Sequence, residues 1–397
     1  KSFSIYNKSS KCLVISTQRA KIEHVHSYYV RKIERIELFE SVKFIANNAF
    51  KNCIKLTKII IPETVKSIGK AAFYGCSSLA EIEIPSSVNE IDSSCFGECE
   101  SLAEITIPES VTKVGKNVFY ECKSLKQVSL SSSVNSIGRS IFNGCSSLAE
   151  ITIPFNVKSI GKSAFFGCSS LTEITIPSSV TSIGRSAFSN CSSLERIIVP
   201  SSVASIGANA FKGCKSLCHI SIPSSVSKIA KCCFKGCSSL ANLLLPNSIT
   251  IIEYAAFFGC SSLEKVTIPS SVTEIESKAF KNCSSLKEIS IPPSVSEIGK
   301  SVFSGCHSIV LSEGMTTVPP YSFKKCSSLT QIPSSVTSIG DYAFYRCSSL
   351  SNISIPSSVT SIGDYAFYGC SSLSSKSIPS SVIETGYHAL HFNIKNC

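Results

Sequence analysis

Cysteine recurs at a fixed spacing through most of this 397-residue chain. Consecutive members of the series are 23 residues apart from Cys53 to Cys306, and intervals of 20, 21 and 23 residues then lead to Cys326, Cys347 and Cys370. A fixed period of roughly 20 to 50 residues is typical of a solenoid, in which each repeat forms one coil and buries its apolar side chains against neighbouring coils. The spacing therefore predicts one elongated domain.

One repeat unit, residues 168–190, predicts the form of every coil. Its segment Glu173–Ile176 alternates polar and apolar residues and is rich in β-branched side chains, which is typical of a half-buried strand. Pro177 ends this strand, because proline has no N–H to donate. Val180–Ile183 predicts a second, shorter strand. We expect Ala187–Phe188 to lie on a single helical turn.

Domain boundaries follow from how well each segment matches this unit. Residues 1–29 do not match and are predicted to be an irregular N-terminal segment or cap. Residues 30–373 are predicted to form the solenoid, and residues 374–397 a degenerate C-terminal cap. Inside the solenoid, one phenylalanine per coil predicts a buried spine from Phe50 to Phe367. The Gly or Asn before most repeat cysteines predicts a left-handed backbone at that position.

The cysteine column allows two interpretations. Stacked coils bring equivalent residues close enough for disulfides, but parallel side chains do not present the Cβ directions that a disulfide requires. We therefore expect the column from Cys53 to Cys370 to consist mostly of free, buried thiols. Four cysteines lie outside the repeat columns and are the candidates for reactive or bridging thiols: Cys12, Cys218, Cys232 and Cys397.

No catalytic or cofactor-binding constellation is present in the sequence. The six histidines never recur in the repeat, and no glycine-rich phosphate loop follows a strand. His24 and His26 are close enough in sequence to hold a metal, but two isolated histidines near an irregular end are better interpreted as surface residues. No apolar run has the roughly 18 residues that a membrane helix needs. We therefore expect no enzyme activity, no cofactor, no metal site and no membrane-spanning segment in this chain.

The repeat C-S-S-L-x-E-I-T-I-P-S-S-V-x-S-I-G-x-x-A-F-x-G closely resembles the leucine-rich repeats of the BspA-like surface antigens. The resemblance covers about residues 30 to 390. It implies an α/β-type repeat that is mostly β: a leucine-rich repeat solenoid with 23-residue coils and a parallel concave sheet. It also implies a cell-surface or extracellular protein that adheres to host matrix or plasma proteins. The alternative is an intracellular protein-binding scaffold, because solenoids present large surfaces in any compartment.

A protein-binding patch is predicted on the strand face between residues 195 and 265. Five coils hold Glu followed by Thr, Ser or Glu at the outward strand positions: residues 81 and 83, 104 and 106, 150 and 152, 173 and 175, and 288 and 290. Four adjacent coils lose this acidic residue, and two of them gain an outward apolar residue, a composition expected at the centre of a protein interface. Drift of a duplicated repeat is the alternative explanation. The patch residues are Arg196, Ile198, His219, Asn242, Leu244 and Lys265.

A basic row is the second candidate site. One position after the Ile-Gly pair carries a cation in five of six coils, and only Ser93 interrupts the series. The chain as a whole has a net charge of +11, which favours encounters with polyanions. The row predicts binding of an acidic polysaccharide, with a merely solvated ridge of charges as the alternative, and no nucleic acid partner is expected. Its members are Lys70, Lys116, Arg139, Lys162 and Arg185.

Overall fold

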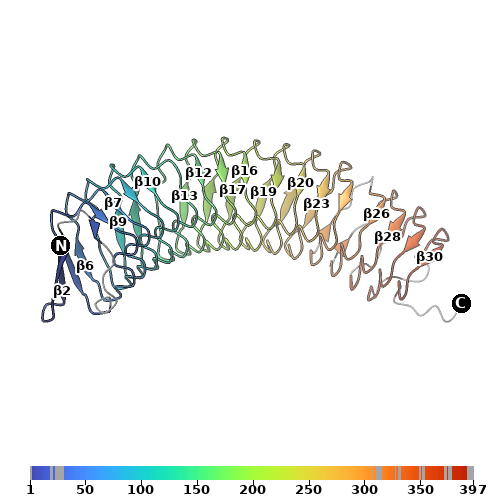
Figure 1. Cartoon of the computed structure of the whole chain (residues 1–397). Coiled ribbons are helices and arrows are strands. Elements are labelled where there is room, and N and C mark those ends of the chain that lie inside the picture. The colour runs from blue at the N-terminus through green and yellow to red at the C-terminus, as the bar shows by residue number, and fades with distance from the viewer. Residues whose placement is uncertain are drawn as a thin grey trace. The chain divides into compact units, whose positions relative to one another are not determined.

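Successive β coils stack along the chain in two units, Lys1–Val203 (unit 1) and Ala204–Cys397 (unit 2) (Figure 1). The computed structural model describes residues 2–17, 21–22, 31–306, 308–309, 315–326, 328–329, 332–347, 350, 354–370, 373 and 378–390. Paired strands of neighbouring coils are parallel and offset by 23 residues, or by 20 and 21 residues where coils are shortened. The described residues contain no helix. The predicted solenoid with a mostly β, 23-residue repeat is confirmed.

The longer strands of unit 1 carry the Glu-Ile-Thr type of sequence. Where their burial is described, the middle residue is buried and its neighbours are exposed, as the alternation of polar and apolar residues predicts. β4 and β6 continue the sheet of the N-terminal hairpin, β9 pairs with β11, and β13 pairs with β15. These strands are β4 (Arg35–Leu38), β6 (Lys58–Ile60), β9 (Glu104–Thr106), β11 (Gln127–Ser129), β13 (Glu173–Thr175) and β15 (Arg196–Ile198).

Shorter strands of two residues form a second set of ladders in unit 1. A polar residue precedes an inward Ile or Val in most of them, which confirms the second strand expected at Val180–Ile183. Five of them form one sheet, in the order β10-β8-β7-β5-β3, and β12 pairs with β14. Their bounds are β3 (Lys21–Ile22), β5 (Phe44–Ile45), β7 (Ser67–Ile68), β8 (Glu90–Ile91), β10 (Lys113–Val114), β12 (Ser159–Ile160) and β14 (Ser182–Ile183).

Unit 2 repeats both sets of strands. Its longer set includes the sheet β19-β21-β23 and the pair β25-β27, and its shorter set the sheets β18-β20-β22-β24 and β26-β28-β29-β30. The longer set is β17 (His219–Ser221), β19 (Asn242–Leu244), β21 (Lys265–Thr267) and β23 (Glu288–Ser290), and it continues in the two-residue strands β25 (Ser308–Ile309) and β27 (Ser328–Leu329). The shorter set is β16 (Ser205–Ile206), β18 (Lys228–Ile229), β20 (Ile251–Ile252), β22 (Glu274–Ile275), β24 (Glu297–Ile298), β26 (Thr317–Val318), β28 (Ser338–Ile339), β29 (Ser361–Ile362) and β30 (Glu384–Thr385).

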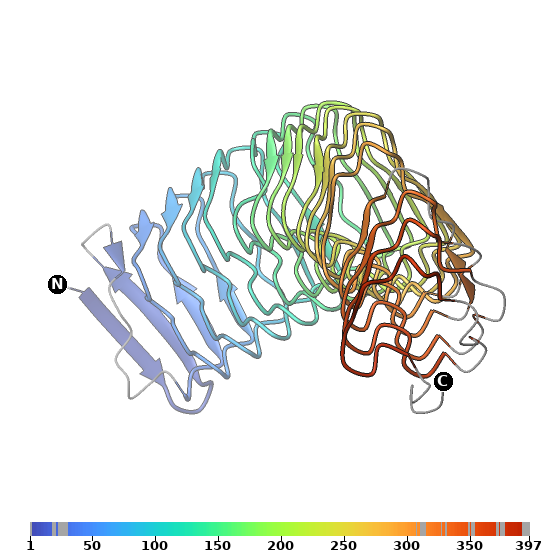
Figure 2. The same cartoon turned by 90° about the vertical axis from the view of Figure 1, so that its right-hand side faces the viewer.

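An antiparallel hairpin of β1 (Ser2–Asn7) and β2 (Cys12–Thr17) begins unit 1 (Figure 2). β2 also pairs in parallel with β4, and the register places Cys12 opposite Arg35, 23 residues later. β2 therefore occupies the place of a strand in a coil that precedes β4.

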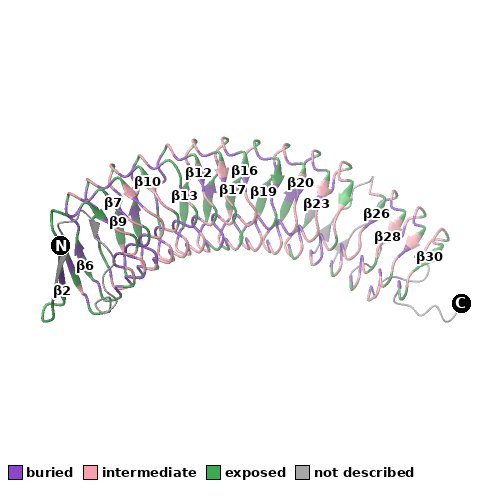
Figure 3. Ribbon diagram, in the orientation of Figure 1, coloured by how far each residue is buried: buried purple, intermediate pink, exposed green. Residues whose placement is uncertain are grey.

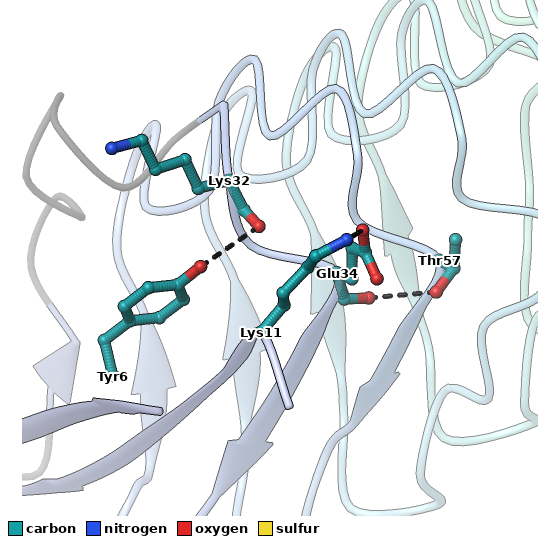
Figure 4. Close-up of polar contacts among 5 residues, drawn as sticks. All are labelled: Tyr6, Lys11, Lys32, Glu34 and Thr57. Atoms are coloured by element: carbon teal, nitrogen blue, oxygen red, sulfur yellow. Dashed lines mark hydrogen bonds and ion pairs between the residues drawn. The ribbon is translucent and has the colours of Figure 1, made fainter. Parts of the chain in front are cut away.

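Polar contacts join this hairpin to the first coils (Figure 4). The Tyr6 hydroxyl donates to the Lys32 carbonyl oxygen at 3.4 Å, and the Lys11 ammonium group pairs with the Glu34 carboxylate. In the next coil, the Thr57 hydroxyl donates to the carbonyl oxygen of Glu34 at 2.9 Å. These groups are exposed, so they orient the hairpin more than they stabilise it.

Phenylalanine rings stack through the interior of each unit. In unit 1 the rings from Phe50 to Phe188 have centroids 5.3 to 5.9 Å apart. In unit 2 the rings from Phe211 to Phe367 are separated by 5.0 to 5.7 Å. All these rings are buried, and Figure 3 shows the alternation of buried and exposed segments around each coil. The predicted phenylalanine spine is confirmed within each unit.

Repeat cysteines lie beside this spine as free thiols. The Cys122 Sγ donates to the carbonyl oxygen of Phe96 in the preceding coil at 3.0 Å, and Cys260 Sγ donates to Phe234 at 3.1 Å. All described cysteines are free, and those of the column from Cys53 to Cys370 are buried, as predicted. Of the four cysteines outside the columns, Cys12 and Cys232 are buried, Cys218 is half-buried, and Cys397 lies outside the described residues.

We expect the column thiols to resist alkylation while the protein is folded. Burial raises the pKa of Cys122, Cys260 and Cys306 to about 12, and only the thiolate reacts rapidly. Mass spectrometry after iodoacetamide treatment should find these positions unmodified in native protein and fully modified in denaturant. Disulfide-linked peptides from most of the column would contradict this assignment.

The segment at Ala187–Phe188 is not the single helical turn that its sequence predicts. Ser186 has φ 55° and Asn190 has φ 62°, and these left-handed residues are incompatible with a right-handed helix. The Ala187 N–H donates to Gly184 at 3.2 Å, while the Ala187 carbonyl accepts from Phe165 N–H in the preceding coil at 2.8 Å. The helix prediction was wrong because hydrogen bonds here join separate coils. The left-handed position before the cysteine is confirmed.

Candidate functional site

The first and third residues of the longer strands point outward and form one exposed surface in each unit, here called the strand face. In unit 1 the register of β13 with β15 places Glu173 beside Arg196 and Thr175 beside Ile198. The side chains of all four are exposed, because alternate strand residues point to opposite sides. The strand face thus presents a regular grid of side chains to a partner.

Two residues of the predicted patch lie on the strand face of unit 1. Ile198 is 65% exposed, although isoleucine is usually buried, and Arg196 is the outward residue two positions before it on β15. The acidic Glu173 and the polar Thr175 flank them on β13. This half of the patch is therefore an apolar side chain among charged and polar ones.

The other four patch residues lie on the strand face of unit 2. Asn242 pairs with Lys265 and Leu244 with Thr267 in the register of β19 with β21. β17, which carries the exposed His219, lies beside β19. Leu244 is 78% exposed. The structure therefore brings His219, Asn242, Leu244 and Lys265 together on three neighbouring strands.

A further apolar residue of the strand face was missed in the sequence. Ile60 is 51% exposed at the third position of β6, the position that Ile198 has on β15. It borders a hollow of about 800 Å³ whose polar lining includes Lys58, Glu81 and Glu83. The triplet Lys-Ile-Ile at residues 58–60 carried the same signal as Arg-Ile-Ile at residues 196–198.

The basic row lies on another part of the unit 1 coils, where backbone hydrogen bonds connect one coil to the next. Asn117 N–H donates to the Arg139 carbonyl oxygen at 3.0 Å, and Ser140 N–H donates to Lys162 at 2.9 Å. Equivalent bonds place Lys70, Ser93, Lys116 and Arg185 in the same column. All five cationic side chains are exposed. The structure thus brings the whole predicted row together.

A cluster of tyrosines near the end of unit 2 was also missed. Tyr321 and Tyr342 stack at 4.8 Å, Tyr342 and Tyr365 stack at 4.9 Å, and the ammonium group of Lys324 lies 5.7 Å from the centroid of Tyr321. A parallel pair joins Tyr345 to Tyr368 at 5.6 Å. Tyr342 and Tyr365, and Tyr345 and Tyr368, are 23 residues apart, so the repeat period carried this signal, and only the step from Tyr321 to Tyr342 is shortened.

An acidic hollow of about 760 Å³ also lies in unit 2. Its lining includes Glu274, Glu276, Glu297 and Tyr254. The register of β22 with β24 places Glu274 beside Glu297. Partial burial, followed by the charges of Glu297, Glu276 and Glu253, raises the pKa of the Glu274 carboxyl. No group of three or more His, Cys, Asp or Glu among the described residues is placed to hold a metal ion.

Histidines and serines form no catalytic arrangement in the part of the chain that the structure describes. His219 is an exposed residue of β17, and His388 packs against the ring of Tyr387 at 4.1 Å. His24 and His26 lie outside the described residues. Turn serines such as Ser179 donate to a carbonyl of the preceding coil, here Val157 at 2.7 Å, which is a structural role. No described segment forms a helix that could cross a membrane.

Comparisons with known proteins agree with this geometry. Comparison with curated proteins finds no match. Among solved structures, the chain is similar to a leucine-rich repeat protein from Bacteroides ovatus, with 28% identity, a TM-score of 0.64, and coverage of 83% of this chain and 98% of that one. It also matches a leucine-rich cell surface protein from Faecalibacterium prausnitzii, with 27% identity, a TM-score of 0.36, and coverage of 98% and 94%.

The family comparison covers nearly the whole chain. The BspA-type leucine-rich repeat region matches residues 20–149, 136–264, 204–330 and 306–396. These ranges contain every repeat cysteine and both candidate sites. Together with the parallel coils and the fold of the Bacteroides ovatus protein, they show that this chain belongs to the BspA-type leucine-rich repeat family.

Proposed function

We propose that this chain is a non-enzymatic adhesion module at a cell surface that binds a host matrix or plasma protein through its strand face. The observation that carries the proposal is the exposure of Ile198 and Leu244, at 65% and 78%, at a strand position where most other coils carry polar residues and β6 carries Ile60. An apolar side chain surrounded by polar ones is the arrangement in which a few residues supply most of the binding energy. Arg196 completes the proposed contact surface of unit 1, and His219, Asn242 and Lys265 complete that of unit 2.

The surface location rests on the resemblance to BspA-like surface antigens. The alternative, an intracellular protein-binding scaffold, would use the same strand face in another compartment. Labelling of intact cells with a membrane-impermeant reagent separates the two. We expect labelling before lysis, and protection until lysis would instead support the intracellular scaffold.

Replacement of Ile198 and Leu244 by threonine is expected to weaken partner binding about tenfold or more, singly or together. Threonine suits a strand, so the melting temperature should stay nearly unchanged. Affinity is measured against a panel of immobilised matrix and plasma proteins.

The matched control is Phe155→Thr, which alters an equally exposed aromatic residue away from the strand positions. This control variant should keep the affinity of the unmodified chain. Unaltered affinity of Ile198→Thr and Leu244→Thr for a panel protein that does bind would exclude the strand face as its site.

A further inference from the structure

We propose that the basic row of unit 1 is a binding site for a linear sulfated polysaccharide, separate from the protein-binding strand face. Arg139, Lys162 and Arg185 are its centre, because they occupy three consecutive coils without interruption. Lys116 continues this run in the preceding coil, and Lys70 extends the row beyond Ser93. A linear polymer is the fitting partner because the cations repeat along a line.

The spacing of the row comes from the backbone. Ser140 N–H donates to the Lys162 carbonyl oxygen at 2.9 Å, and Ser163 N–H donates to Arg185 at 2.9 Å. Neighbouring coils joined in this way are about 4.8 Å apart. The charges therefore lie well within the screening length of about 8 Å at physiological salt, and their repulsion is relieved when a polyanion binds.

Some exposed lysines of unit 1 pair with an acidic residue one coil away, whereas no cation of the row does. Lys113 pairs with Glu90, and Lys123 pairs with Glu100 at 2.7 Å. Among the described residues, none of the five cations of the row forms an ion pair. The positive charge of the row is thus not compensated by an ion pair.

The wider surface of these coils has the same sign. Residues 122–194 contain six Lys and Arg against two Glu, which leaves four positive charges. The two acids, Glu150 and Glu173, occupy the first strand position, which belongs to the strand face. The centre of the row, at Arg139, Lys162 and Arg185, therefore has no acidic neighbour within its own stretch of the coil, whereas Asp92 lies beside Ser93 at the gap in the row.

Small residues border the centre of the row on both sides. A Cβ added to Gly184 would lie 2.7 Å from the Gly161 backbone of the preceding coil, so close coil packing favours glycine there. The opposite border holds serines with φ of 52° to 55°. A polymer can therefore approach the cations without meeting a bulky side chain. The border residues are Gly138, Gly161, Gly184, Ser140, Ser163 and Ser186.

These borders also favour a sulfated polysaccharide over a nucleic acid. Proteins that bind single-stranded nucleic acids combine a cationic track with aromatic side chains on which the bases stack. The positions next to Arg139, Lys162 and Arg185 are glycine and serine only. A track of charge without stacking surfaces fits a partner recognised through its sulfate groups.

The test uses the full chain and a size-defined heparin oligosaccharide as the probe. The row variant carries Arg139→Ser, Lys162→Ser and Arg185→Ser. The control variant removes the same charge elsewhere in unit 1, at three exposed lysines that form no ion pair in the described part: Lys43→Ser, Lys55→Ser and Lys126→Ser. At about 0.15 M salt, we expect the row variant to bind at least about tenfold more weakly and the control variant within about twofold of the unmodified chain.

A gain-of-function variant guards against a loss caused by misfolding. Ser93→Lys fills the gap between Lys70 and Lys116 and should tighten heparin binding. Equal losses in the row and control variants, or no tightening by Ser93→Lys, would overturn the proposal. So would tighter binding of a single-stranded RNA of equal charge, because the row would then be a nucleic acid site.

Discussion

Raising the pH from 9 to 12 is expected to unfold the protein, because its buried thiols keep their protons only in the folded chain. Burial raises the pKa of Cys122, Cys260 and Cys306 from 9.0 to about 12. Above pH 9 the unfolded chain loses these protons while the folded chain retains them. Stability therefore falls as pH rises through this window, by about 1.4 kcal/mol per pH unit for each thiol, and is unaffected by these thiols below pH 9.

Denaturant titrations at several alkaline pH values measure this slope. Cys260→Ala with Cys306→Ala, both in unit 2, should reduce the slope for that unit by about 3 kcal/mol per pH unit. The slope is the relevant quantity, because alanine also removes packing and the bonds from Sγ to Phe234 and Phe280. Lysine and tyrosine side chains titrate in both the variant and the unmodified chain, so they do not contribute to the difference between the two slopes. An unchanged slope would show that these thiols are not protected from ionisation by the fold.

Truncation of one spine ring, Phe142→Ala, is expected to lower the free energy of unfolding of unit 1 by about 3 to 5 kcal/mol. Phe142 is fully buried and stacks on Phe119 at 5.5 Å and on Phe165 at 5.4 Å. Because coils depend on their neighbours, the cavity weakens the contacts on both sides of the altered coil.

Phe155→Ala is the control for this change. Phe155 is 78% exposed, so its truncation should alter stability by no more than about 0.5 kcal/mol. Chemical denaturation followed by circular dichroism compares the two variants. Equal stability of Phe142→Ala and Phe155→Ala would contradict the contribution to folding stability that is assigned to the phenylalanine spine.

Regular features of the coil could be predicted because the same types of residue recur at the same positions in every repeat. The Glu-Ile-Thr alternation predicted β13 and its equivalents, and the Gly or Asn before the cysteine predicted a left-handed position that Glu98 and Glu121 also adopt, with φ of 58° and 56°. A residue preference that recurs in many repeats reflects the structure of the coil, whereas a single residue at one position can occur by chance. The fold was accordingly predictable almost coil by coil.

Features that depend on contacts between coils were harder to predict. The small-large pair Ala187–Phe188 suits a helical turn locally, and only the hydrogen bonds to the preceding coil show that it forms turns. A second left-handed position, at Ser186 and its equivalents, was missed because serine, alanine and tyrosine together occupy it more often than asparagine. The thiol to carbonyl bonds of the cysteine column were likewise invisible in the sequence.

The candidate sites also divide into features that the repeat positions predict and features that depend on contacts in the structure. Column positions alone predicted the basic row, because equivalent residues must stack. Exposure of Ile198 and Leu244 also followed from strand alternation. The stacking of Tyr342 on Tyr365 could have been predicted in the same way, because they are 23 residues apart, whereas the hollow beside Ile60 depends on side-chain placement and required the structure.

Hydroxyl-radical footprinting of the chain bound to a matrix or plasma protein tests the proposed strand-face interface most directly. The account predicts that Ile198 and Leu244 become shielded from oxidation, while the exposed Phe155 and Ile383 are modified at the same rate as in the free chain. Shielding of Phe155 or Ile383, with Ile198 and Leu244 still oxidised at the free rate, would contradict it and place the partner on another surface.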